Sequence, residues 1–323
     1  MNFFRVFALA LLLAAPLAAL PQSYPSKPVH LITQFAAGST GDVLCRVMAN
    51  ALADATRVPV IVDNRPGAGG VLAAELAARS APDGYSLLVA TTGTQVMRVY
   101  LAKNQSFDPV KDFTPITELG ETATLLVAHP SFPAHSLREM LEYARSHPGQ
   151  VTYGTSGIGS PHHLSGELLQ QLTGVQLVHV PYKASAQALQ DTIAGQLMTT
   201  FAISGLAVPA VRSGKVHALA VNRDSRFAAL PDVPTISEVV PGFETPPSWT
   251  GLFGPAAMPQ PLLRQVHALV VKTLNAAAVR SKLAEGYFDV ITNKTPEDFQ
   301  VQIAREITLV GRIVKAAGIP ATE

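Results

Sequence analysis

The sequence predicts an α/β protein built from two doubly wound domains with a hinged ligand cleft between them. Three observations lead to this expectation. Short apolar strands, small-residue loops and amphipathic helices follow one another in order, which is typical of parallel α/β units. This rhythm changes once near the middle of the chain and then starts again. The length of 323 residues is also enough for about two domains of ordinary size.

The first 19 residues are predicted to be a secretory signal that is removed from the mature protein. Arg5 precedes an apolar run over residues 6–13, and small residues continue as far as Ala19. The alternative is a membrane anchor, which needs about 20 apolar residues, and Pro16 interrupts this stretch. We therefore expect the chain to be exported.

The first predicted domain begins after the signal and alternates strands with helices. Residues 29–35 form an apolar run bounded by proline and glycine, which predicts a buried strand. The next apolar residues, over 43–52, fall at helical spacing, and Asp42 is placed to cap that helix. The series continues with strands at 60–62 and 86–90 and a helix at 71–79.

A second series follows a change of rhythm after residue 113. Two apolar segments flank Gly120 and predict the crossing into the second domain, and Ser136 with Glu139 predicts a capped helix. Further strands are expected at 151–155, 177–180, 198–201 and 217–221, and further helices near 162–172, 185–194 and 207–213.

The end of the chain is expected to return to the first domain. The proline-rich stretch 230–247 is predicted to be the return path, and helices are expected at 261–278 and 296–317. The predicted domains are therefore residues 20–122 with 230–323 for the first, and residues 123–229 for the second. The crossings near residues 120 and 230 are the predicted hinges.

Composition excludes several classes of function. Lys+Arg 24 against Asp+Glu 23 leaves no basic field that would attract a phosphate backbone, so nucleic acid is not an expected partner. Without residues 1–19 the count falls to 23 against 23, because the predicted signal holds Arg5 and no acid. Cys45 is the single cysteine and has no partner for a disulfide or a thiolate metal site. We expect no cofactor and no metal.

The first candidate site is the loop at residues 35–42, between the first strand and the first helix. Its small residues let backbone N–H groups approach a ligand, and a helix N-terminus adds partial positive charge. This combination suits a carboxylate or a phosphate. The loop fits neither the P-loop pattern nor the dinucleotide pattern. The alternative interpretation is a tight turn with a helix cap.

The second candidate, at residues 153–163, repeats the device in the other domain. Ser156 and Ser160 supply hydroxyl donors, whereas His163 is either a donor to the ligand or a structural residue, which we favour. His162 is expected at the surface. Two helix N-termini on opposite walls of one cleft would together form an anion site.

Three weaker candidates lie elsewhere. Thr91 and Thr92 follow a strand at the end of the sheet where such folds bind ligands. Tyr182 and Lys183 lie in a loop, where Lys183 also suits a solvated charge. Trp249, the only tryptophan, suits either the core or a cleft wall. The glycine-rich turn at 65–70 is interpreted as turn geometry.

Catalytic motifs are missing from the sequence. It contains no Gly-x-Ser-x-Gly elbow and no His-Glu-x-x-His helix. We therefore expect a binding protein with no catalytic residues. A secreted hydrolase that uses Ser156 and His163 is the enzyme alternative.

Taken together, the loops resemble the Bug family, the periplasmic substrate-binding proteins of tripartite tricarboxylate transporters. The matching segments cover essentially the whole mature chain in order. They are Tyr24-Pro25, residues 35–42, Asn64-Arg65-Pro66-Gly67-Ala68-Gly69-Gly70, Pro82-Asp83-Gly84-Tyr85, residues 153–163, His179-Val180-Pro181-Tyr182-Lys183, Pro231-Asp232-Val233-Pro234-Thr235 and Trp249-x-Gly251-Leu252. The resemblance implies a flytrap-type periplasmic receptor, a monomer, that captures a small carboxylate and presents it to the transporter's membrane components.

The resemblance also implies which residues hold the ligand. The family's first loop and its second-domain loop contact the carboxylate, and this chain departs from the family pattern at Ala36, Gly38-Ser39, Ala184 and Met198. These departures bear on ligand identity rather than ligand class. We expect dipoles, not salt bridges, to hold the anion; a sensor that serves a signalling partner is the alternative role. The candidate ligand-binding residues are Ala37, Gly38, Ser39, Thr40, Asp42, Thr91, Thr92, Ser156, Gly157, Gly159, Ser160, His163, Tyr182, Lys183 and Trp249.

Overall fold

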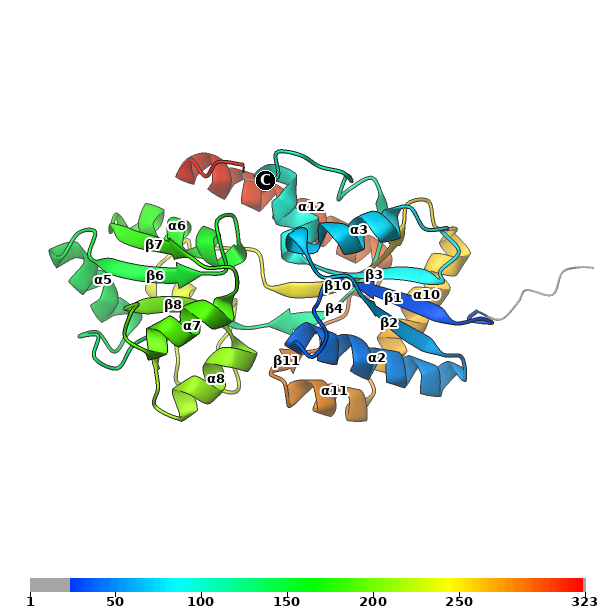
Figure 1. Cartoon of the computed structure of the whole chain (residues 1–323), viewed down its shortest axis with the longest axis horizontal. Coiled ribbons are helices and arrows are strands. Elements are labelled where there is room, and N and C mark those ends of the chain that lie inside the picture. Colours follow the sequence, from blue (N-terminus) through cyan, green and yellow to red (C-terminus); the bar gives the residue numbers. More distant parts are fainter. Residues whose placement is uncertain (1–23, 322–323) are drawn as a thin grey trace, which may run out of the picture.

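The computed structural model describes residues 24–321, so the predicted signal at residues 1–19 lies outside the described residues. Two β-sheets, each covered by helices on both faces, lie end to end (Figure 1). We call the part built on the six-stranded sheet the first lobe and the part built on the five-stranded sheet the second lobe. This is a two-domain α/β fold of the predicted class.

The elements run in the following order. They are β1 (Val29–Thr33), α2 (Thr40–Thr56), β2 (Val60–Asn64), η1 (Ala68–Gly70), α3 (Val71–Ala78), β3 (Ser86–Thr91), η2 (Gly93–Met97), α4 (Arg98–Leu101), β4 (Phe113–Thr122), β5 (Thr124–Ala128), α5 (Leu137–Ser146), β6 (Val151–Thr155), α6 (Pro161–Thr173), β7 (Leu177–Pro181), α7 (Ser185–Ile193), β8 (Thr199–Ile203), α8 (Ser204–Arg212), β9 (His217–Asn222), α9 (Ile236–Val239), β10 (Trp249–Pro255), α10 (Gln260–Leu274), α11 (Ala277–Ala284), β11 (Phe288–Asp289) and α12 (Pro296–Ala317).

The sheet of the first lobe has the order β11-β4-β10-β3-β1-β2. Strands β1, β2 and β3 are parallel, whereas β10 runs antiparallel to both β3 and β4. The parallel strands therefore end at the same edge of the sheet, toward the second lobe. The loop that leads to α2 leaves from this edge after Thr33, and η2 follows β3 there.

The sheet of the second lobe has the order β7-β6-β8-β5-β9. Strand β6 is parallel to β7 and β8, and β5 is antiparallel to its two neighbours. The carboxyl ends of β6, β7 and β8 lead into α6, α7 and α8. These helix N-termini lie at the side of the second lobe that faces the first lobe (Figure 1).

Alternating side chains along β3 build two cores on opposite faces of the first sheet. Leu87 and Val89 pack with α2 and α10, while Leu88 and Ala90 pack with α3 and α12. Successive side chains of a strand point to opposite faces of its sheet, and burial of both sets is typical of a strand in the middle of a sheet covered on both faces. In the second lobe, α5 and α6 cover one face and α7 with α8 the other.

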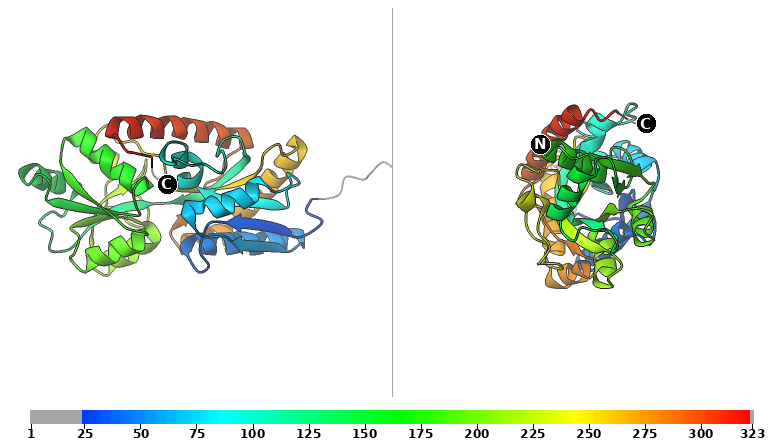
Figure 2. Two further views of the ribbon diagram at one scale, coloured as in Figure 1. Left: turned by 45° about the horizontal axis from the view of Figure 1, so that its top comes forward. Right: turned by 90° about the vertical axis from the view of Figure 1, so that its left-hand side faces the viewer.

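The lobes are joined by two chain crossings and bridged by one helix. Strand β4 ends at Thr122 and β5 begins at Thr124, while residues 223–248 lead from β9 back to β10. Helix α12 packs on β4 of the first lobe and on α6 of the second, and it lies along both lobes (Figure 2). The division into domains at residues 122 and 230 stays a prediction.

One predicted helix is wrong in its extent. The expected helix over 261–278 is two helices, α10 and α11, with a break at Asn275. The Asn275 amide donates to the Val271 carbonyl and to Thr292, which ends α10 through local side-chain bonding. Helix α12, by contrast, starts at the predicted Thr295 cap, whose hydroxyl accepts from the Asp298 N–H.

Residues 24–321 contain no helix that is both long and apolar enough to cross a membrane.

Candidate functional site

Two adjoining cavities lie between the lobes, and residues of both lobes line each of them. The smaller has a volume of about 280 Å³ and the larger about 420 Å³. Thr91, Gly93, Ser156 and Pro161 line both cavities. The polar groups around the smaller cavity come from Thr40, Gly41, Thr91, Thr92, Thr122, Ser156, His162, Ser185, Ser248 and Thr250, and its apolar wall from Phe35, Ile203, Trp249 and Phe288.

The loop before α2 is held by a buried carboxylate. Asp42 is 1% exposed and accepts hydrogen bonds from the Gly38 N–H, the Arg46 guanidinium and the Asn64 amide. Burial acts to raise the pKa of Asp42, but these hydrogen bonds and the charge of Arg46 outweigh it and lower the pKa. The helix cap itself is Ser39 rather than Asp42, as the Ser39 hydroxyl accepts from the Asp42 N–H.

This arrangement leaves backbone N–H groups in the first turn of α2 without hydrogen-bond acceptors. The N–H groups of Thr40 and Gly41 make no hydrogen bond within residues 24–321, and both residues line the smaller cavity. Orphan N–H groups at a helix N-terminus attract an anion, because their partial charges add to the helix dipole. Ala37, Gly38, Ser39 and Asp42 line neither cavity.

The loop before α6 uses most of its own donors internally. The Ser160 N–H donates to the Gly157 carbonyl, the Gly157 N–H donates to Thr155, and the Ser160 hydroxyl both caps α6 and donates to Gly157. Ser156, Gly159 and Ser160 line the larger cavity, whereas Gly157 lines neither. The sequence predicts free backbone donors in this loop, whereas in the structure most of them are bonded within the second lobe.

The expectation that His162 lies at the surface is wrong. The side chain is buried beside Phe201, its Nδ1 lies 3.0 Å from the Ser156 Oγ, and it lines the smaller cavity. Burial lowers the pKa of His162 to about 4, so the ring is neutral at ordinary pH. Its backbone N–H, in the first turn of α6, has no acceptor in the described part of the chain.

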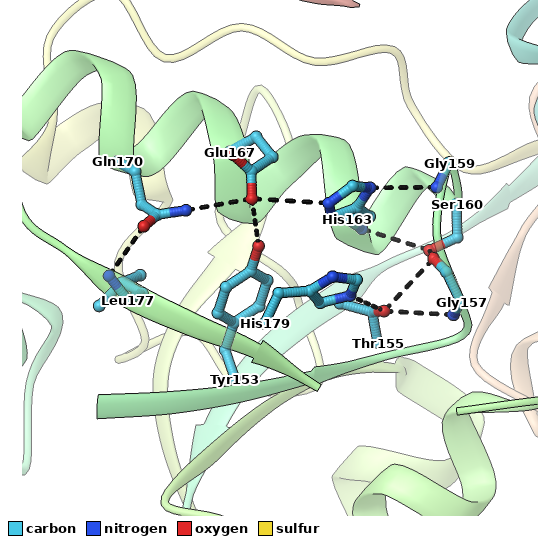
Figure 3. Close-up of polar contacts among 10 residues, drawn as sticks. All are labelled: Tyr153, Thr155, Gly157, Gly159, Ser160, His163, Glu167, Gln170, Leu177 and His179. Atoms are coloured by element: carbon cyan, nitrogen blue, oxygen red, sulfur yellow. Dashed lines mark hydrogen bonds and ion pairs between the residues drawn. The ribbon is translucent and has the colours of Figure 1, made fainter. Parts of the chain in front are cut away.

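His163, for which a structural role is favoured from the sequence, lines neither cavity. Figure 3 shows its contacts. Its Nδ1 accepts a hydrogen bond from the Gly159 N–H at 3.0 Å, and its Nε2 lies 3.5 Å from a carboxylate oxygen of Glu167. The ring stacks on His179 with centroids 4.1 Å apart. His163 therefore holds the cavity loop from behind.

Thr91, Thr92 and Trp249 meet where β3 and β10 pair. The Thr92 hydroxyl donates to the Pro247 carbonyl and accepts from the Trp249 N–H, which ties the return path to this strand end. Trp249 is 1% exposed and also lines the smaller cavity, so it is both a core residue and a wall of the site.

Tyr182 and Lys183 lie outside both cavities. The Tyr182 hydroxyl donates to Asp191, and burial with this bond raises the pKa of Tyr182 to about 12. Lys183 is exposed. No Lys or Arg lines the smaller cavity among the described residues.

The structure adds residues that the sequence reasoning missed or interpreted as turns. Gln34 lines the larger cavity, donates to Thr91 and accepts from Thr94. The glycines of the 65–70 turn and Arg98 of α4 also line this cavity. Their position at the cavity follows from the sheet order, because β1, β2 and β3 end side by side, and no local motif predicts it.

A buried pair of carboxyl groups lies behind Trp249. The indole Nε1–H donates to Glu306 at 2.7 Å, and the Gln302 amide donates to both Glu306 and Glu118. Burial raises the pKa of Glu306 to about 7 and that of Glu118 to about 8. Between residues 24 and 321, no cluster of three or more His, Cys, Asp or Glu residues has the arrangement of a metal site.

Comparisons with known proteins give consistent results. The model of the "Tripartite tricarboxylate transporter family receptor" matches residues 44–319. A UPF0065 protein of Bordetella pertussis is 30% identical, covering 98% of this chain and 97% of its own length. Protein BugT of the same organism is 31% identical over 95% and 93%.

Several solved structures are also similar. An R. palustris protein solved with adipate is 32% identical with a TM-score of 0.82, covering 92% of this chain and 99% of its own. MatC of Rhodopseudomonas palustris with bound malate is 34% identical with a TM-score of 0.76, over 90% and 100%. The periplasmic binding protein BugD is 30% identical with a TM-score of 0.78, over 92% and 99%.

Proposed function

The chain belongs to the family of tripartite tricarboxylate transporter receptors, and from that premise we propose that it is a periplasmic receptor for a small organic carboxylate. The ligand is captured in the smaller cavity, between the lobes, and passed to the membrane components of a transporter of this type. The predicted signal at residues 1–19 directs the export that this role needs.

One observation carries the proposal. The N-termini of α2 and α6 meet at the smaller cavity, and the N–H groups of Thr40, Gly41 and His162 have no acceptor within residues 24–321. Hydroxyl groups such as that of Ser156 surround them. A carboxylate offers several acceptor positions to such donors, and the neutral apolar wall leaves room for an aliphatic body.

The affinity of such a site does not require a cationic side chain. A micromolar dissociation constant corresponds to about 8 kcal/mol. Each hydrogen bond to a charged group contributes about 1.5 to 3 kcal/mol, and each helix N-terminus up to about 2 kcal/mol in a partly buried site. Four bonds and two termini exceed the requirement and offset the cost of ordering the ligand.

The relatives support the ligand class. One similar structure was solved with adipate and another with malate, and both molecules are small carboxylates. We propose that lobe closure about the crossings near residues 120 and 230 traps the ligand, because residues of both lobes line the cavity.

Native mass spectrometry of freshly purified protein tests the proposal. We expect a monomer that carries a dissociable small acid, and a thermal-shift panel of carboxylates that raises the melting temperature. A protein that carries no small acid and responds to no member of the panel would contradict the proposal. The partner that binds the ligand-loaded protein distinguishes the two roles. A membrane permease indicates transport, and a signalling protein indicates the alternative role of a sensor.

One contact bears on the alternative of a hydrolase. The Ser156 Oγ lies 3.0 Å from the Nδ1 of His162, which is the spacing of a nucleophile and its general base. The sequence alternative pairs Ser156 with His163 instead. No carboxylate orients His162 among the described residues, and burial lowers its pKa to about 4, which makes it a poor base at neutral pH. We therefore expect no ester hydrolysis beyond that of a Ser156→Ala variant.

A further inference from the structure

The loop at residues 156–160 lines the larger cavity and, through Ser156, the smaller one. Besides its internal bonds, an imidazole nitrogen outside the loop holds it. Gly159 donates its backbone N–H to His163 Nδ1 at 3.0 Å. A hydrogen bond of this kind requires a lone pair on Nδ1, so the ring proton of neutral His163 is on Nε2. That nitrogen faces Glu167 at 3.5 Å (Figure 3).

The two nitrogens of His163 thus meet opposite partners. The Nε2 side faces an acceptor, and a second ring proton leaves this contact intact or strengthens it. On the Nδ1 side the new N–H would face the Gly159 N–H, so two donors would oppose each other and the loop bond would be lost. Protonation of His163 therefore keeps the contact between Nε2 and Glu167 and breaks the hydrogen bond from the Gly159 N–H to Nδ1.

The titratable groups around His163 have partners of their own, and Glu306, whose pKa burial raises to about 7, is common to the wild-type protein and the His163 variants. His179 stacks on the ring and its Nε2 is bonded to Thr155, and burial together with the His163 charge lowers the pKa of His179 to about 4. Tyr153 donates its hydroxyl to Glu167. The helices that pack near α6 carry Arg98, which bonds the Asn104 carbonyl, and Glu306, which bonds Trp249.

Release of Gly159 bears directly on the cavities. Gly159 has a φ of +76°, and a Cβ placed on it would lie 3.2 Å from Leu101 of the first lobe. The loop therefore has a backbone conformation that favours glycine at this position, and it lies close to Leu101 on the other side of the cleft. Ser160, which follows it, caps α6 through the His163 N–H. A shift of this loop would move the walls of both cavities at once.

We propose that His163 is a positioning residue that makes ligand capture dependent on pH: its neutral form locks the cavity loop, and its protonated form unlocks it. This inference rests on the proposed function and adds a regulation to it. The receptor should therefore hold its carboxylate at pH 7.5 and release it in mild acid.

Calorimetric titration with adipate and with malate, between pH 7.5 and 5.0, measures the effect on binding. For the wild-type protein we expect the affinity to fall about tenfold more than for His163→Asn, whose side-chain oxygen replaces Nδ1 as an acceptor without titrating. His163→Leu should bind weakly at every pH, because it leaves the Gly159 N–H without an acceptor. His30→Asn, at an exposed strand position, is the matched control and should follow the wild type.

Amide hydrogen exchange of ligand-free protein tests the same bond without any ligand. After correction for the intrinsic rate, protection of the Gly159 N–H should fall between pH 7.5 and 5.0 in the wild type and stay constant in His163→Asn. Equal pH dependence of both proteins, in exchange and in binding, would overturn the proposal while leaving the receptor function intact. A protein that binds no carboxylate at pH 7.5 but shows the exchange pattern would instead contradict the function.

Discussion

The loop before α2 and the loop before α6 present helix N-termini to the same cavity, but different chemistry holds each in place. In the first lobe a buried carboxylate, Asp42, gathers the Gly38 N–H, Asn64 and the charge of Arg46. In the second lobe the partners are neutral: the Ser160 hydroxyl and the rings of His162 and His163. One wall is locked by a charge pair, and the other by neutral hydroxyl and imidazole groups.

This difference shows how one receptor can combine a rigid wall with a responsive one. Hydrogen bonds and the charge of Arg46 keep the pKa of Asp42 below its ordinary range, so the first loop keeps its lock from neutral pH into acid. The stability that Asp42 contributes is lost only as the pH falls through that lowered value. The second loop has no such charge pair and depends on the hydrogen bond from the Gly159 N–H to His163 Nδ1.

Removal of the charged lock should have the largest consequence for binding. Asp42→Ala leaves the Gly38 N–H and Asn64 without their acceptor, so the first loop should loosen. We expect the affinity for a carboxylate to fall about 100-fold, and the free energy of unfolding to fall by about 2 kcal/mol. Calorimetry and urea denaturation measure the two effects. Asp54→Ala, on the same helix, is the control, and equal behaviour of both variants would show that the first loop does not depend on its acid.

Removal of a hydroxyl from the neutral wall should have a smaller effect. Ser156 lines both cavities and bonds only to His162 among the described side chains. Ser156→Ala therefore deletes one hydroxyl with its bond to His162, and the bonds of Gly157, Gly159 and Ser160 stay in place. We expect about a tenfold loss of affinity with little change in stability. Ser213→Ala, on the exposed end of α8, should bind like the wild type. A Ser156→Ala variant with unchanged affinity would place the ligand elsewhere.

The buried pair Glu118 and Glu306 adds a pH dependence of stability that must be separated from that of the loops. Burial raises both pKa values, to about 8 and about 7, so the folded state retains protons that the unfolded state releases above a pH of roughly 4.3. The contribution of this pair to stability is therefore fully present below that pH and is lost as the pH rises through about 7 and about 8. Denaturation at several pH values should show a smaller fall for Glu306→Gln. A fall of the same size in that variant would contradict the assignment.

An exposed cation near the cleft should contribute nothing measurable. Lys183 lines neither cavity and lies in the loop before α7. Because the proposed anion site relies on N–H and hydroxyl donors, Lys183→Ala should change the carboxylate affinity by less than about twofold. Isothermal titration at low and high salt checks this. A large loss at low salt would show that a side-chain charge takes part in capture.

Much of the fold follows from local patterns in the sequence. Strand β6 and helix α12 begin and end where apolar spacing and the Thr295 cap predict. The antiparallel strands β4 and β10 were not predicted as such, because the direction of a strand depends on where distant segments pair. The break at Asn275 was missed because a side chain, rather than proline or glycine, ends α10.

The candidate site was predictable in outline and not in detail. The two strand-loop-helix units identify both walls, because small residues and helix starts are local features. The roles of individual residues depend on their neighbours in space. Asp42 serves the loop through Asn64, which lies 22 positions away, and His162 is buried by the second lobe's own sheet. Gln34 and Arg98 line the larger cavity only because separate strands end together.

The single tryptophan gives the protein a built-in optical probe. Trp249 lines the smaller cavity, its ring packs against Phe253 and Phe299, and its indole N–H is bonded to Glu306. All indole fluorescence of the native chain therefore originates at one wall of the cleft. Emission recorded without any attached dye would report the arrival of a ligand on one side of the ring and the ionisation of a carboxyl group on the other.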